Sequence, residues 1–64
     1  MYRYNYMITA HYKDGAIVHF GISVLANDRE EADNKLKYSV EMDSWLYERP
    51  IREWKSVLID REKD

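Results

Sequence analysis

Apolar residues occupy every second position in two stretches of the chain, residues 2–12 and 16–26. The even positions of the first stretch hold Tyr2, Tyr4, Tyr6, Ile8, Ala10 and Tyr12. Those of the second stretch hold Ala16, Val18, Phe20, Ile22, Val24 and Ala26. A period of two is typical of β-strands that bury one face. The sequence therefore predicts two strands, joined by a turn at residues 13–15.

The length of this turn decides which residues of the two strands face each other. A two-residue loop at Asp14-Gly15 would pair each even position with an odd one and leave neither face of the sheet apolar. A three-residue loop pairs Tyr12 with Ala16, and every further even position with another even position, so that one face becomes wholly apolar. We predict the three-residue loop, with Gly15 in the left-handed region as a G1 bulge.

A helical pattern follows the second strand. Asp28 is the expected N-cap, and Glu31, three residues later, is its capping-box partner. Apolar residues then recur on one helical side, at Ala32, Leu36, Val40, Leu46 and Tyr47. Pro50 sets the limit of the helix, which we predict from about residue 29 to 47.

A third strand is predicted from about Glu53 to Asp60, and the charged tail 61–64 is expected to fray. The helix must cover the apolar face of the sheet, because no other element is available. If the third strand pairs with the first, the sheet is antiparallel with strand order 2-1-3. We therefore predict an α+β fold: a ββαβ two-layer sandwich with a three-stranded antiparallel sheet and one helix on one face, forming a single domain over residues 1–64.

This arrangement predicts the core. The residues expected to be most buried are Ile8, Phe20, Ile22, Leu36 and Val40, followed by Leu46. Trp54 and Leu58 are placed in the core as well, because the small Ser56 between them allows close approach of the helix.

Two features leave alternatives open. Tyr2, Tyr4 and Tyr6 are either half-buried core under the helix, which their parity favours, or a platform on which nucleic-acid bases stack. Tyr2 and Tyr4 are expected to be the most accessible of the three. Asp43 falls on the apolar side of the helix. Either the helix breaks there, which we favour, or Asp43 accepts a hydrogen bond from a core tyrosine.

Composition narrows the function classes. The chain has no cysteine, which excludes disulfides and Cys-based zinc sites, and only two glycines, too few for a glycine-rich phosphate loop. Its net charge of −2 lacks the basic excess of nucleic-acid-binding domains. His11 and His19 are diagonal neighbours on the face opposite the predicted core but have no third ligand at strand spacing, so we expect exposed histidines and no metal site. We expect no enzyme, no cofactor and no small-molecule substrate, and the apolar runs are too short for a membrane span.

The face of the sheet opposite the helix carries more apolar residues than a small monomer usually exposes. We expect the interaction surface to consist of Met7, Ile17, Gly21, Leu25, Val57 and Ile59. Gly21 is either a local weakness or bulge, or a point of close approach for a partner. A secondary interaction stripe is expected at Tyr38, Met42 and Trp45, unless Trp45 folds over the sheet edge.

The sequence therefore predicts a small cytoplasmic, non-enzymatic protein-interaction module that self-associates or binds a protein partner. Short ββα units with a DG turn and an EEA-type helix start occur in many unrelated bacterial and phage proteins. This resemblance is generic and implies no residue-level function. An accessory or regulatory protein of the bacterial or phage type is part of our hypothesis. The alternative hypothesis is a nucleic-acid-binding module that uses an aromatic sheet surface.

Overall fold

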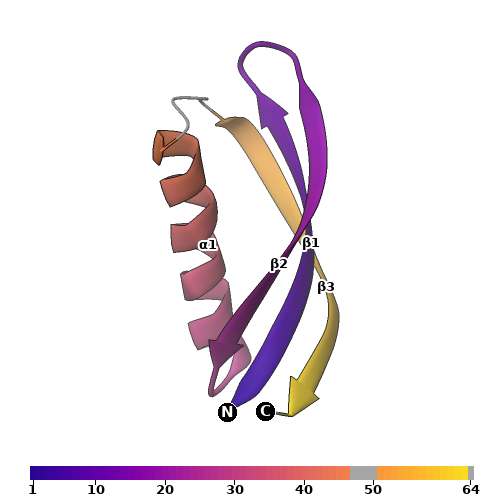
Figure 1. Cartoon of the computed structure of the whole chain (residues 1–64), viewed down its shortest axis with the longest axis vertical. Helices are drawn as coiled ribbons and strands as arrows, with labels where there is room; N and C mark the ends of the chain where they lie inside the picture. Colours follow the sequence, from indigo (N-terminus) through magenta and orange to yellow (C-terminus); the bar gives the residue numbers. More distant parts are fainter. Residues whose placement is uncertain (47–50, 64) are drawn as a thin grey trace.

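Three strands and one helix make up the fold (Figure 1). The computed structural model describes the backbone of residues 1–46 and 51–63, and the side chains of the same ranges except 43–46. In chain order the elements are β1 (Tyr2–Tyr12), β2 (Ile17–Ala26), α1 (Arg29–Leu46) and β3 (Ile51–Lys63). The sheet is antiparallel with the order β2-β1-β3, and α1 lies against one of its faces. The predicted ββαβ fold is confirmed.

The β1–β2 hairpin has the predicted three-residue loop. The Tyr12 N–H donates to the Ala16 carbonyl at 2.9 Å, and Gly15 has φ of +93°. Asp14 adds a local bond, because its Oδ1 accepts from the Ala16 N–H at 2.9 Å. From there, each even position of β1 faces an even position of β2. The confirmed register gathers the apolar side chains on one face of the hairpin.

The start of α1 has the predicted N-cap, but only one of the two bonds of the predicted capping box. Asp28 Oδ1 accepts from the Glu31 N–H at 2.8 Å, which is the N-cap bond. The reciprocal half of the capping box differs. The Glu31 carboxylate pairs with Lys35 Nζ at 3.1 Å and accepts from Asn27 Nδ2 at 3.4 Å. The nearby ammonium of Lys35 is also the main cause that lowers the pKa of Glu31.

α1 continues without a break from Arg29 to Leu46. The predicted break at Asp43 is therefore wrong at the level of the backbone. The alternative hydrogen bond of Asp43 lies outside the described side chains, as does the expected burial of Leu46. Tyr47 and Pro50 lie outside the described residues altogether.

β3 is longer than predicted at both ends and includes residues 61–63. The expected fraying of Arg61, Glu62 and Lys63 is wrong, because these residues pair with the start of β1. Arg3 lies 3.9 Å from the Glu62 carboxylate, and the Arg61 guanidinium stacks over the Tyr2 ring at 4.4 Å. Residues 61–63 form a charged segment in the sequence, but side-chain contacts on both faces of the sheet hold them in β3.

Two register shifts interrupt the pairing of β1 with β3. One leaves Ile59 as an extra residue between the Asn5 and Tyr6 pairs, and the other leaves Arg52 as an extra residue near Tyr12. A bulge of this kind reverses the alternation of side chains beyond it. As a result Asp60 faces away from α1, although its even number matches that of Leu58 on the other face.

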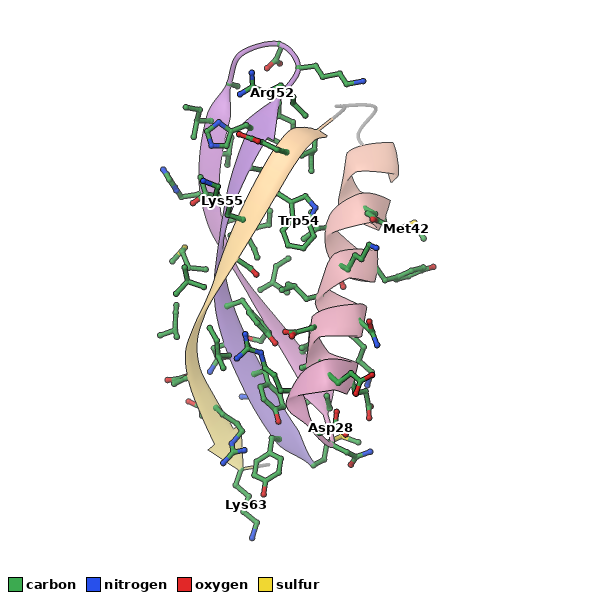
Figure 2. All side chains as sticks on the ribbon, turned by 180° about the vertical axis from the view of Figure 1, so that it is seen from behind. Asp28, Met42, Arg52, Trp54, Lys55 and Lys63 are labelled. Carbon is green, nitrogen blue, oxygen red and sulfur yellow. The ribbon has the colours of Figure 1, made fainter. Side chains whose placement is uncertain are left out.

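The core lies between α1 and the sheet. Its buried side chains are Tyr4, Tyr6, Ile8, Val24, Ala26, Ala32, Leu36 and Val40. Trp54 and Leu58 pack against it as predicted, and Figure 2 shows Trp54 between β3 and α1.

Three burial predictions need correction. Phe20 and Ile22 are half-buried, whereas Val24 and Ala26 on the same edge strand are buried. The reason is that β2 lies beside α1 at its Ala26 end and twists away from α1 towards the hairpin (Figure 1). Tyr4 is only 2% exposed instead of being accessible. It sits on the central strand, the Tyr2 ring packs edge-on against it at 6.3 Å, and β3 reaches past it.

The molecule is elongated and covered on one side only. Its radius of gyration is 12.2 Å, against about 11 Å for a compact domain of this length. The 18 residues of α1 span about 27 Å, whereas the 11 residues of β1 span about 37 Å. The hairpin turn therefore projects beyond the end of α1 (Figure 1). Within the described residues, no helix has the length and apolar character needed to cross a membrane.

Candidate interaction surface

The open face, defined as the face of the sheet turned away from α1, carries the odd-numbered residues of β1 and β2. β3 adds Glu53, Lys55 and Val57, and Asp60 and Glu62 beyond the bulge. The predicted apolar residues of this face are exposed: Met7 42%, Ile17 57%, Leu25 40%, Val57 65% and Ile59 59%. Full burial of side chains of this size favours association by about 1.5–3 kcal/mol each.

These residues do not form one continuous patch. Met7 and Val57 are directly paired in the middle of the sheet, with the bulged Ile59 next to them on β3. We call these three residues the central apolar cluster. Ile17 and Leu25 lie at opposite ends of β2, about 26 Å apart at the usual rise of a strand. The open face thus has an apolar centre and two separate apolar positions along its β2 edge.

Gly21 lies beside the central apolar cluster, opposite Met7. The pairing of β1 with β2 shows no register shift there, so the bulge hypothesis for Gly21 is wrong. An added Cβ would meet only the Tyr6 carbonyl oxygen, at an ordinary 3.7 Å. The fold itself therefore does not require glycine at this position, and the missing side chain leaves one flank of Met7 uncovered.

Polar rows flank the central apolar cluster on both sides along the strands. On one side, Ser23 Oγ donates to Asn5 Oδ1, and Asn5 Nδ2 donates to Asp60 Oδ1. On the other side, Thr9 lies between His19 and Lys55. Alternation along the sequence does not find Asp60 as part of this surface, because the bulge at Ile59 reverses the parity.

The two histidines lie on the open face as predicted, His11 opposite Ile17 and His19 opposite Thr9. His19 is exposed as expected, whereas His11 is half-buried. His19 Nδ1 shares a hydrogen bond with Thr9 Oγ1 at 3.0 Å. Among the described residues, no group of three or more His, Cys, Asp or Glu side chains is placed to hold a metal ion.

The expected secondary stripe is only partly described. Tyr38 is 65% exposed and Met42 is half-buried, whereas the Trp45 side chain lies outside the described residues. The structure brings Tyr38 to the same groove as Leu25, between α1 and the β2 edge. This open groove has a volume of about 770 Å³, and Lys35 crosses it to donate from Nζ to the Leu25 carbonyl at 2.6 Å.

Hydrogen bonding across the layers fixes α1 to the sheet. The Tyr6 hydroxyl donates to Asp33 Oδ1 at 2.7 Å, and the same oxygen accepts from Arg29 Nε at 3.0 Å. Burial and, secondarily, the Asp33 carboxylate raise the pKa of Tyr6 to about 12. The Tyr6 hydroxyl and then Arg29 lower the pKa of Asp33. These contacts use the polar end of Tyr6 for packing, so its ring is not available as a stacking surface.

Comparisons of the chain with protein-family models, with curated proteins and with solved structures found no match.

Proposed function

We propose that this chain is a non-enzymatic protein-interaction module that associates through the open face of its sheet. A cytoplasmic accessory or regulatory role, of the bacterial or phage type, is part of the proposal. Such a module acts by occupying a surface, and it needs no reaction of its own.

The observation that carries the proposal is the exposure of the central apolar cluster. Val57 and Ile59 are 65% and 59% exposed, and Met7 beside them is 42% exposed. One helix can cover only one face of a three-stranded sheet, and α1 covers the other face. Contiguous exposed apolar residues with a polar surround are typical of protein-binding surfaces.

The alternative, nucleic-acid binding by an aromatic sheet surface, has less support. Tyr4 and Tyr6 are 2% and 1% exposed, and the accessible ring of Tyr2 is stacked under Arg61. Single-strand binding uses exposed rings along a basic groove, and two of the three rings are buried under α1.

Light scattering and thermal melting over a range of protein concentrations test the proposal. Association predicts a mass that rises with concentration and a melting temperature that rises with it. Val57→Lys should abolish both effects and leave a folded monomer, because it places a charge in the central apolar cluster. A shallow dependence of the association on salt would separate it from phosphate binding, which weakens steeply with ionic strength.

Tyr38→Lys provides the matched control. Tyr38 has the same exposed fraction as Val57, 65%, but lies on α1. Association that survives Val57→Lys and is lost with Tyr38→Lys would contradict the proposal and assign the interaction to the helix. The proposal would also be contradicted if the wild-type chain stays monomeric at high concentration and binds no other protein through a surface that includes Val57.

A further inference from the structure

We infer that the occupant of the open face is a second copy of this chain, related to the first by a two-fold axis that runs across the strands. This inference rests on the proposed function of the open face. The axis passes through the row of Gly21, Met7 and Val57, which are paired across the three strands. What supports it is the order of charged and apolar residues on either side of that row.

Lys55 and Asp60 lie at matching positions on opposite sides of the central row. Lys55 pairs with Thr9, two residues beyond Met7, and Asp60 pairs with Asn5, two residues before it. Each is displaced by about 7 Å from the row, and both are on β3. A two-fold rotation about the row therefore places Lys55 over Asp60 of the second copy, and it forms this pair twice.

Apolar residues match in the same arrangement. Ile17 lies four residues to one side of Gly21 and Leu25 lies four residues to the other side. The rotation places Ile17 over Leu25 of the second copy, and it places Met7 and Val57 over their own counterparts. The two separate apolar positions on β2 thus become a second contact in the dimer, although each is isolated in the monomer.

The other two-fold axis within the interface, along β1, fits poorly. It would place the apolar Leu25 over Glu62 and Ile17 over Glu53, and it would leave Lys55 over His19. The axis across the strands has one like-charge contact, Glu53 over Glu62. Each of these carboxylates already has a cation in its own chain, Arg52 at 3.8 Å and Arg3 at 3.9 Å.

The size of the face sets the strength of this dimer. β1 spans about 37 Å, and three strands about 4.8 Å apart span about 15 Å, so the open face is long and narrow, and Figure 1 shows that it is twisted along its length. Full overlap covers roughly 600 Å² on each copy, below the about 800 Å² of a standard interface. Packed sheets also cross at about 30°. This angle displaces Lys55 from Asp60 by about 4 Å, which the long Lys55 side chain can span, and Ile17 from Leu25 by about 7 Å. We therefore expect a weak dimer that dissociates in the micromolar range.

Charge reversal tests the axis. Lys55→Asp alone would place two aspartates over each other, and Asp60→Lys alone would place two lysines over each other, so each should weaken self-association by about tenfold or more. An equimolar mixture of the two variants should form a mixed dimer, because both contacts between positions 55 and 60 then join opposite charges. The double variant, Lys55→Asp with Asp60→Lys, should dimerise like the wild type.

Lys63→Asp is the matched control. Lys63 lies on β3 but pairs with Tyr2, on the face opposite to Lys55, so its reversal should leave dimerisation unchanged. Sedimentation equilibrium measures all of these variants. If the wild type dimerises but the mixture of the two single variants associates no more strongly than each variant alone, the proposed two-fold axis is wrong. The proposed function of the open face would still stand. A wild-type chain that does not dimerise would overturn the second copy as occupant, whether or not another protein binds the open face.

Discussion

Tyr6 combines nearly complete burial of its ring with a hydrogen bond from its hydroxyl to Asp33. Its pKa is about 12 in the fold and 10.0 in the unfolded chain, so folding favours the protonated phenol. The stability it contributes is complete below pH 10 and is lost as the pH rises towards about 12. Tyr6→Phe should lower the free energy of unfolding by about 1 kcal/mol at neutral pH and remove this part of the alkaline loss.

Chemical denaturation from pH 7 to 12 measures this effect, and Tyr38→Phe is the control because Tyr38 is exposed. An alkaline profile of Tyr6→Phe identical to that of Tyr38→Phe would contradict the role given to the Tyr6 hydroxyl.

The stability that Asp33 contributes depends on pH in the opposite direction. The pKa of Asp33 is lowered below 3.8 in the fold, so its contribution is lost only as the pH falls through that lowered value.

The sequence predicts burial well on the central strand and less well on the edge strand. Ile8 on β1 and Leu36 on α1 are buried as expected. Phe20 has the same parity and a larger side chain but remains half-buried, since the edge strand β2 twists away from α1 between Val24, which is buried, and the hairpin. The odd or even position of a residue predicts which face of the sheet it lies on. The extent of its burial depends on the neighbours that it has in the folded structure.

At the scale of the elements, the two glycines of the hairpin are expected to respond in opposite ways to substitution by alanine. Gly15 has φ of +93°, where a side chain is strained, so Gly15→Ala should destabilise the monomer by about 1–2 kcal/mol. Gly21 lies in β2 with room for a Cβ. Gly21→Ala should leave the stability unchanged or raise it by about 0.5–1 kcal/mol.

Thermal unfolding at low protein concentration, where the monomer predominates, measures both variants. Equal destabilisation by the two substitutions would contradict the expectation that only Gly15 requires glycine. Gly21→Ala should also weaken self-association in the dimer described above, because it fills the gap beside Met7.

Among the elements, the hairpin and the helix start could be predicted from local signals, but the full extent of β3 could not. The DG turn and the Asp28 cap each act through bonds within a few residues. Residues 61–63 are held by long-range contacts, such as Arg61 over the Tyr2 ring. The bulge at Ile59 is likewise set by pairing with β1, and for that reason the place of Asp60 on the open face is not visible in the sequence.

At the scale of the whole molecule, the shape of the monomer distinguishes the possible dimers. Face-to-face packing of two open faces leaves the long dimension near the 38 Å of the monomer and adds to the thickness, because packed sheets lie about 10 Å apart. Pairing through the free edge of β2 would instead widen the sheet. End-to-end contact through the projecting hairpins would nearly double the length.

Small-angle X-ray scattering over a concentration series separates these shapes. We expect the longest dimension to stay almost constant while the mass doubles, and the radius of gyration to rise only modestly above the 12.2 Å of the monomer. Val57→Lys supplies the monomer curve, since its charge lies in the centre of the open face. A longest dimension that increases strongly with the mass would contradict face-to-face packing, because no overlap of two open faces lengthens the particle to that extent.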